Sequence, residues 1–278
     1  MRVTLLGSGE AVGVPAPLCD CDYCLQSERR RRPGLLIETD DATVVLDASP
    51  DIKEQLHRTG TATVDVVFLT HHHYDHVGGL HDLVHARMGF DTHVGIEDGY
   101  LNPDAFDEAE KPADPEFSVY MTATAQNHLG ETNPHLGDTL DVRRIDHHNP
   151  VKVGDLHVVP FPVQHADSAF DTVGFAVSDG DAKIVYAPDM WAFENDPDEG
   201  DVAYTDADVL FAEGAALFRA FGHGEEADLR RALEAADADR TVLVNLNEHL
   251  QRMTTDELRE AAREDGYELG TDFAVYSL

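Results

Sequence analysis

Residues 64–76 read VDVVFLTHHHYDH, and this stretch decides the fold. Its first seven residues are mostly apolar and β-branched, which predicts a buried strand. Four residues of metal-ligand type follow that strand in the spacing His-x-His-x-Asp-His: His71, His73, Asp75 and His76. Because side chains at positions i and i+2 of an extended chain point the same way, His71 and His73 can share one metal ion.

The chain is expected to turn into a helix after His73, so that Asp75 and His76 project from its first turn toward a second ion. Imidazole and carboxylate ligands together suit zinc, manganese or iron. The chain holds 16 histidines, so one His-x-His pair alone would carry little weight. Four such residues in this order, directly after a buried strand, predict a metal centre.

Other strand ends are expected to supply further ligands. His165 follows the predicted strand VVPFPVQ, and Asp189 follows the predicted strand AKIVYAP. A carboxylate at such a position can bridge two cations roughly 3.5–4 Å apart, the arrangement used for in-line displacement at phosphorus. We therefore predict that His165 and Asp189 join the histidine motif.

Three cysteines, Cys19, Cys21 and Cys24, lie close together near the N-terminus. Their number is odd and their spacing is too short for a disulfide framework, so the cluster predicts metal ligation. The alternative interpretation is three buried thiols in a turn.

The chain has 278 residues, with 20 Lys and Arg against 54 Asp and Glu, which gives a formal charge of −34. An apolar fraction of 42% excludes a disordered acidic tail. The charge argues against a simple electrostatic affinity for nucleic acid or anionic membranes, without excluding either. An acidic, lysine-poor surface is typical of proteins in concentrated salt, where screening acts over roughly 3 Å at 1 M. We therefore predict a halophilic protein.

No apolar run is long enough for a transmembrane helix, and the first residues lack the basic and apolar regions of a secretory signal. We expect a cytoplasmic protein with no membrane partner.

Strands and helices are expected in both halves of the chain, which fits a duplicated sandwich. Residues 91–140 are acidic and punctuated by Pro and Gly, so loops or a partly ordered lid are expected there around a single strand. No linker divides the chain, so we expect one domain over residues 1–278 with this insertion at about 91–140. Strands are predicted over 2–6, 34–39, 43–47, 64–70, 117–122, 151–153, 156–163, 172–178, 182–187 and 241–246, and helices over 51–59, 77–88, 225–236 and 254–265.

Motifs spread over nearly the whole chain resemble those of the metallo-β-lactamase-fold hydrolases. The His-x-His-x-Asp-His sequence is specific to that superfamily. The Cys-x-Cys-x-x-Cys sequence narrows the resemblance to the branch that contains the phosphoribosyl cyclic phosphate phosphodiesterase. The matching segments are GSGEAVGVP (7–15), the cysteines (19–24), VLDASPDIKEQL (45–56), VDVVFLTHHHYDHVGGLHDL (64–83), VQHAD (163–167), YAPD (186–189), GHGEEADL (222–229), VLVNLNEH (242–249) and YELGTDF (267–273).

The resemblance implies a mixed α/β (α+β) fold, namely a four-layer αββα sandwich with the metals at one edge. It also implies which residues hold the ions. One ion would be held by His71, His73 and His165, the other by Asp75 and His76, and Asp189 would bridge the two.

Three residues are catalytic candidates by the same resemblance: His223, Asp75 and Asp47. Asp47 matches a position that orients a ligand histidine. His223, in Gly-His-Gly, matches a general acid that protonates the leaving oxygen, a role that suits the pKa of imidazole.

Two positions depart from the pattern of this branch. Asn245 stands where the last histidine of the second metal site is expected, and a neutral amide oxygen is a weaker ligand than imidazole. The fourth ligand of a structural zinc would be Glu248 or His249 beside the cysteines. Three Cys and one His make a closed tetrahedral zinc set, so we favour His249, although it would also be near enough to swing into the catalytic site.

The expected reaction is the metal-dependent hydrolysis of a small or cyclic phosphodiester, with one or two catalytic Zn²⁺ or Mn²⁺ ions and a structural Zn²⁺ at the cysteines. The main alternative is a ribonuclease Z-like tRNA 3′ endonuclease, whose RNA-grasping arm is usually basic and glycine-rich, unlike residues 91–140. A hydrolase of another ester, thioester or lactone and a non-catalytic metal-stabilised binding protein are further alternatives. Relatives are often dimeric, so a homodimer is also expected.

Overall fold

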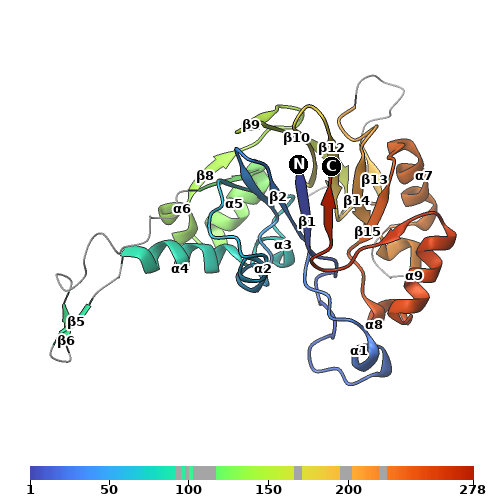
Figure 1. Ribbon diagram of the computed structural model, residues 1–278, viewed down its shortest axis with the longest axis horizontal. Coiled ribbons are helices and arrows are strands. Elements are labelled where there is room, and N and C mark those ends of the chain that lie inside the picture. The colour runs from blue at the N-terminus through green and yellow to red at the C-terminus, as the bar shows by residue number, and fades with distance from the viewer. Residues whose placement is uncertain (92–94, 98–99, 103–116, 166–170, 195–201, 219–223) are drawn as a thin grey trace.

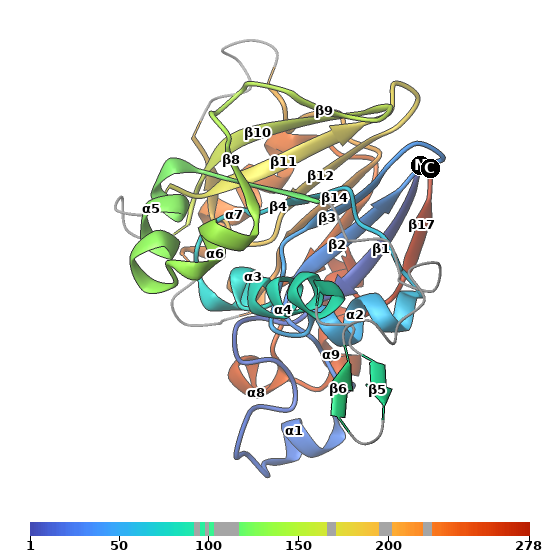
Figure 2. The same cartoon turned by 90° about the vertical axis from the view of Figure 1, so that its left-hand side faces the viewer.

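Two large sheets lie face to face, with helices on both outer sides (Figures 1 and 2). The computed structural model describes residues 1–91, 95–97, 100–102, 117–165, 171–194, 202–218 and 224–278. The mixed α/β sandwich that the sequence predicts is confirmed.

The first sheet has seven strands, in the order β17-β1-β2-β3-β4-β7-β8. These strands are β1 (Arg2–Gly7), β2 (Gly34–Glu38), β3 (Thr43–Leu46), β4 (Val66–Phe68), β7 (Ser118–Met121), β8 (Asp141–Arg144) and β17 (Val275–Ser277). A separate hairpin is formed by β5 (Gly95–Glu97) and β6 (Tyr100–Asn102). Pairing of β1 with β17 places the two chain ends side by side (Figure 1).

The second sheet has eight strands, in the order β13-β10-β11-β12-β14-β15-β16, with β9 paired to β10. These strands are β9 (Val151–Val153), β10 (Leu156–Gln164), β11 (Val173–Ser178), β12 (Lys183–Ala187), β13 (Ala192–Phe193), β14 (Val209–Glu213), β15 (Thr241–Val244) and β16 (Glu268–Leu269). Strands β12, β14 and β15 are parallel neighbours, so their carboxyl ends meet at one edge.

Longer helices cover the outer faces of the sheets, and shorter ones connect the strands. The helices are α1 (Asp22–Gln26), α2 (Ile52–Thr59), α3 (Tyr74–Val77), α4 (Leu80–Asp91), α5 (Ala123–Thr132), α6 (His135–Thr139), the 3₁₀ helix η4 (Ala215–Phe218), α7 (Glu226–Ala236), α8 (Glu248–Gln251) and α9 (Thr255–Glu264). Thr254 caps the N-terminus of α9 through a capping box with Glu257. None of the described helices is both long and apolar enough to cross a membrane.

Three apolar clusters fill the three spaces between the four layers. The central cluster joins the two sheets and includes Phe68 and Phe175, whose ring centroids are 5.4 Å apart. A second cluster packs α7 and α9 on the second sheet, through Leu229, Leu233 and Leu258. A third packs α2, α4, α5 and α6 on the first sheet. The sandwich is therefore held by burial on both faces of each sheet.

Several elements differ from the sequence-based expectation. Within residues 117–140, loops were expected around one strand, but α5 and α6 form, because Leu129 and Leu136 are buried against the first sheet. Strand β14 was not predicted, although all five of its residues are buried.

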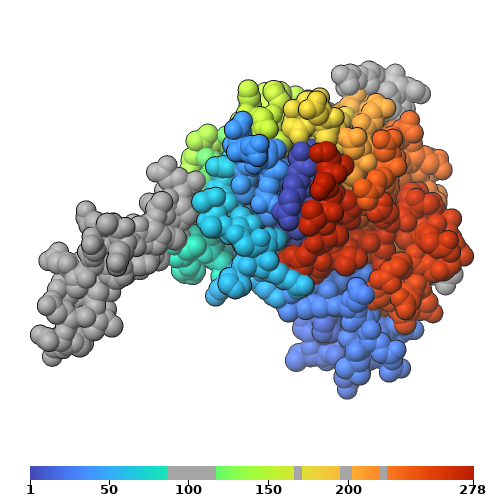
Figure 3. Space-filling model, in the orientation of Figure 1, coloured from blue at the N-terminus to red at the C-terminus, as the bar shows by residue number. Residues whose placement is uncertain are grey.

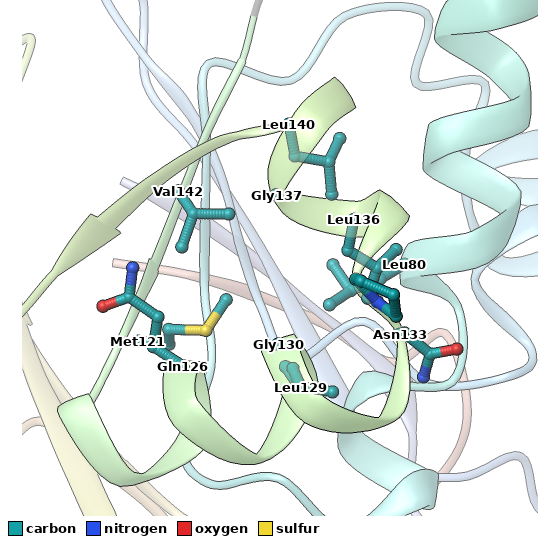
Figure 4. A pocket seen from close by; sticks show the side chains of 11 residues that line it. Leu80, Met121, Gln126, Leu129, Gly130, Asn133, Leu136, Gly137, Leu140 and Val142 are labelled. Carbon is teal, nitrogen blue, oxygen red and sulfur yellow. The ribbon is translucent and has the colours of Figure 1, made fainter.

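An apolar cavity of about 140 Å³ lies among α4, α5, α6 and the edge of the first sheet (Figure 4). Leu80, Leu129, Leu136 and Val142 are among its lining residues, and the lining contains none of the candidate metal ligands.

Candidate metal centre

The predicted ligands come together where strands of both sheets end. The motif at His71 follows β4, His165 follows β10, and Asp189 lies two residues beyond β12. Ring nitrogens and carboxylate oxygens from these segments form two groups within 4.8 Å, and His71 belongs to both. The two sheets thus bring together ligands that lie far apart in the sequence.

The first group consists of His71, His73 and His165. The Nε2 atom of His71 lies 2.8 Å from Nδ1 of His73, and Nε2 of His165 lies 3.4 Å from the same Nδ1 atom. Three imidazole nitrogens facing one point are a common zinc-binding arrangement.

The second group consists of His71, His76 and Asp189, all buried. The Oδ2 atom of Asp189 is 2.5 Å from Nε2 of His76 and 4.0 Å from Nε2 of His71. Asp75 is also buried here, with its Oδ2 atom 3.1 Å from Nε2 of His76. Asp189 therefore stands between the two groups, as a bridging carboxylate would.

Asp47 holds the orientation of two ligand histidines. Its Oδ2 atom lies 2.7 Å from Nδ1 of His76, and a carboxylate can only accept, so that nitrogen donates and Nε2 keeps its lone pair. Thr70 donates its hydroxyl proton to Asp47, over 3.0 Å. The Thr70 oxygen must then accept from Nδ1 of His71, 3.0 Å away, which leaves Nε2 of His71 as a free ligand atom.

Burial and charge set the protonation states of these groups. Burial, reinforced by neighbouring histidines, holds the pKa of His71 well below its usual range. Burial alone would raise the pKa of Asp189, but the surrounding histidines keep that pKa well below its usual range. Burial also opposes a charge on His76, yet the carboxylates around it raise the pKa of His76 well above its usual value. The site thus favours a neutral His71 and an ionised Asp189, and its carboxylates favour positive charge at His76, supplied either by a second proton on the ring or by a cation bound to Nε2.

The donor set fits a metal ion. The buried atoms Nε2 of His76 and Oδ2 of Asp189 face each other but make no hydrogen bond with any described residue. Buried polar atoms without a partner are costly, and a shared cation would satisfy both.

Asn245, the predicted weak ligand, directly follows β15. Its amide nitrogen donates to Oδ1 of Asp189 and, over 2.8 Å, to Oε2 of Glu213. Glu213 ends the unpredicted strand β14 and pairs in register with Val244, so only the long-range strand pairing places it here. The sequence signal that was overlooked is the apolar run that leads to it, residues 209–212.

The three cysteines and His249 form a separate group. The Nδ1 atom of His249 lies 3.3 Å from the sulfur of Cys19, 3.2 Å from that of Cys21 and 3.6 Å from that of Cys24. The structure therefore places His249 with the cysteines and not with His76. The segment that carries the three cysteines and α1, residues 19–26, protrudes from the body of the molecule (Figure 3). We call this segment, together with His249, the cysteine lobe.

The cysteines differ in their acidity. A hydrogen bond from the backbone of Cys24 and another from His249 lower the pKa of Cys21 to about 6. Burial raises the pKa of Cys24 to about 11. A metal ion binds thiolates, so one ligand is already ionised at neutral pH and another must release a proton.

His223, the predicted general acid, lies outside the described residues. The nearest described feature is Gly224, where a Cβ atom would come within 2.5 Å of Cβ of Trp191. The ring of Trp191 in turn lies 6.2 Å from that of His165.

Residues 42–244, which are more than half of the chain, match the sequence model of a protein family described as "Beta-lactamase superfamily domain". The chain belongs to the beta-lactamase superfamily. Its fold is that of a metallo-β-lactamase-fold hydrolase, as the resemblance of the motifs implies, and its His and Asp groups are suitable for a metal ion.

Two curated relatives of this superfamily member share part of its sequence. An octanoyltransferase of Porphyromonas gingivalis is 47% identical over 87 residues, which cover 30% of this chain and 18% of that protein. A ribonuclease Z of Methanopyrus kandleri is 38% identical over 154 residues, which cover 52% of this chain and 44% of that protein. The chain spans less than half the length of either relative.

Solved structures share the fold over its whole length. Zinc-bound PqqB of Methylobacterium extorquens has a TM-score of 0.74 at 20% identity, with all of both chains covered. A diphosphatase of the PhnP family has a TM-score of 0.72 at 22% identity, covering all of this chain and 97% of that one. The short form of human tRNase Z has a TM-score of 0.56 at 17% identity, covering all of this chain and 99% of that one. At these identities the likeness shows the fold alone.

Proposed function

We propose that this chain is a metal-dependent phosphodiesterase that cleaves a small or cyclic phosphate diester. The observation that carries the proposal is the pair of ligand groups that share His71 and face Asp189. Two adjacent cation positions suit the in-line displacement of an oxygen at phosphorus.

Divalent ions held by these residues would lower the pKa of water toward neutral pH and would neutralise charge on the phosphoryl group. The chain's own residues hold and orient the site. Asp47 and Thr70 keep the Nε2 atoms of His71 and His76 facing inward. His223 is proposed to give its proton to the leaving alkoxide, as the resemblance implies.

The catalytic ions are proposed to be Zn²⁺ or Mn²⁺, and the cysteines with His249 are proposed to hold a structural Zn²⁺. Three thiolates and one imidazole saturate a tetrahedral zinc ion and leave no position for substrate. The cysteine lobe therefore has a structural rather than a catalytic donor set.

The charge of −34 supports a small substrate, because phosphate-rich polymers are repelled by a strongly acidic surface. The fold is shared with a PhnP-family diphosphatase, so phosphorus chemistry is compatible with it. Positive potential inside the site would come from the ions, so the outer charge does not prevent the binding of a compact phosphate ester.

A second candidate is tRNA 3′ processing, because the chain is 38% identical to a ribonuclease Z over 154 residues. Cleavage of a precursor tRNA would favour this reaction. The affinity of the protein for RNA should then fall steeply as the salt concentration rises, since each phosphate that the protein neutralises releases counterions.

The test is hydrolysis of bis(p-nitrophenyl) phosphate with added Zn²⁺ or Mn²⁺, together with a count of bound metal per chain. We expect His73→Ala to lose about a hundredfold or more in rate, because it removes a ligand of the first group. Cys21→Ser should lose about one zinc and keep its activity.

Two further outcomes decide the reaction class. Full activity in His73→Ala, or no hydrolysis with any metal, would overturn the phosphodiesterase proposal. His223→Ala should slow poor leaving groups much more than p-nitrophenolate, because only a basic leaving oxygen needs a proton. Equal losses on both would reject the general-acid role.

A further inference from the structure

Asn245 lies between two buried carboxylates at the edge of the metal centre. Its amide nitrogen contacts Oδ1 of Asp189 on one side and Oε2 of Glu213 on the other, and all three residues are buried. An amide oxygen in that place would face two acceptors and be repelled, so the nitrogen must point toward them.

Glu213 fixes this orientation of the Asn245 amide from the side opposite Asp189. Its second carboxylate oxygen, Oε1, accepts the backbone N–H of Ala215 over 2.6 Å, so the carboxylate is held at both oxygens. A buried carboxylate needs such donors, and the amide of Asn245 supplies one of them. Rotation of the Asn245 amide would therefore cost both carboxylates a hydrogen bond.

The contact also decides which oxygen of Asp189 faces the ligands. Asn245 occupies Oδ1, and Oδ2 is the oxygen that lies 2.5 Å from Nε2 of His76 and 4.0 Å from Nε2 of His71. The amide of Asn245 thus holds Asp189 in the rotation that a bridging carboxylate requires.

We propose that Asn245 is a positioning residue for Asp189, and that the metal position at His76 consequently binds its ion more weakly than the three-histidine position. The position of His71, His73 and His165 has four donors when Asp189 is included. His71 is counted at the three-histidine position, because its single Nε2 lone pair can bind only one ion and lies 2.8 Å from Nδ1 of His73. Among the described residues, the position at His76 then has three donors, namely His76, Asp75 and Asp189. Asn245 adds none, because the atom that it presents to Asp189 is a nitrogen that cannot ligate. This proposal rests on the metal part of the proposed function and not on the substrate.

Titration with Mn²⁺ tests the proposal, because thiolates bind this hard ion poorly and the cysteine lobe can keep its zinc. Isothermal titration and electron paramagnetic resonance should show two Mn²⁺ classes whose dissociation constants differ by about tenfold or more. Asn245→His should add a fourth donor and bring the weaker class close to the tighter one. Asn245→Ala should weaken the weaker class by about tenfold or more and the tighter class by less, because three histidines still hold the ion there when Asp189 turns.

Asn247→Ala is the matched control. Asn247 is a buried amide two residues away, and its nitrogen donates to Glu10 and to the carbonyl of Gly13 instead of to the metal centre. It should disturb the same loop and leave both Mn²⁺ classes intact. Equal effects of Asn245→Ala and Asn247→Ala would reduce Asn245 to a structural role and overturn the proposal.

Two other results would also overturn it. One is two Mn²⁺ classes of equal affinity in the unaltered protein. The other is a crystal structure of the Mn²⁺-loaded protein with Oδ1 of Asn245 within about 2.2 Å of an ion, the bonding distance of an oxygen ligand. A protein that binds no Mn²⁺ at the histidines at all would instead contradict the metal centre, and with it the proposed function.

Discussion

The carboxylate of Asp47 accepts hydrogen bonds from three surrounding side chains: Thr70, His76 and Tyr186. It is fully buried, and it also accepts the backbone N–H of Thr70 over 2.9 Å. With only acceptor oxygens, it sets which nitrogen of each neighbouring histidine carries a proton. The tautomers of His71 and His76 are thus decided by a residue that lies behind the ligands.

Asp47→Asn should lower the affinity of the histidine site for Mn²⁺ by about 10- to 100-fold, since the amide replaces one acceptor oxygen by a donor. The measurement is the Mn²⁺ dissociation constant by isothermal titration. Tyr186→Phe is the control, because it removes a single hydrogen bond of 3.1 Å to Asp47 and leaves both acceptor oxygens in place. An Asp47→Asn protein with unaltered affinity would show that Asp47 does not orient the ligands.

Most of the site could be predicted at the level of single residues, because its ligands follow recognisable strands. His71, His73 and His76 have local spacing, and His165 and Asp189 mark strand ends. The apolar run 209–212 could have revealed the strand that ends at Glu213, but not the contact of Glu213 with Asn245, because the two residues meet only through the register between strands distant in sequence. Long-range register leaves no local signal.

At the scale of elements, the short helix α3 and the start of α4 are held against the loop that follows β3. The N–H of Ala48 donates to the carbonyl of His76 over 2.8 Å, and the N–H of Gly79 donates to the carbonyl of Ala48, also over 2.8 Å. A Cβ atom on Gly79 would come within 2.2 Å of the carbonyl oxygen of Ser49. This close approach fixes the position of the ligands on α3 relative to Asp47.

Gly79→Ala should therefore destabilise the protein by about 1–3 kcal/mol, the usual cost of overpacking, and should also weaken Mn²⁺ binding. Thermal unfolding and Mn²⁺ titration measure the two effects. Gly130→Ala is the matched control, because Gly130 lies within α5 and a Cβ atom there meets no atom within 4 Å. It should stabilise the protein by up to about 1 kcal/mol, since alanine favours helix. Equal effects of the two substitutions would contradict this account of Gly79.

Helices whose apolar residues recur at regular helical spacing were predicted well. Helices that form only when they pack on a neighbouring element were not. The amphipathic helices α7 and α9 were expected within a residue of their observed bounds. Helices α5 and α6 were not predicted, because an acidic segment that contains Pro and Gly is typical of loops. Their few leucines become a helical face only when the first sheet offers a surface to cover.

At the scale of the whole molecule, charge is distributed unevenly between the surface and the interior. Arginines of the run 29–32 each pair with a carboxylate, and Arg30 and Arg31 are buried in these pairs. With 54 acidic and 20 basic residues, most carboxylates have no basic side chain to pair with. The surface therefore carries a large net repulsion that opposes folding at low salt.

Raising KCl from 0.1 M to 2 M should increase the unfolding temperature by at least about 5 °C, or roughly 2 kcal/mol of stability. The screening length falls from about 10 Å at 0.1 M to about 3 Å at 1 M, so repulsion between neighbouring carboxylates is largely removed. The measurement is the unfolding temperature against KCl concentration, with sucrose as a control for exclusion of solute from the protein surface. Neutralising the exposed carboxylates Asp40, Asp41 and Glu131 to their amides should raise the unfolding temperature at 0.1 M and flatten its dependence on salt. A salt dependence that this triple substitution leaves unchanged would attribute the effect to ordinary salting-out, and the acidic surface would then have to be explained by solubility alone.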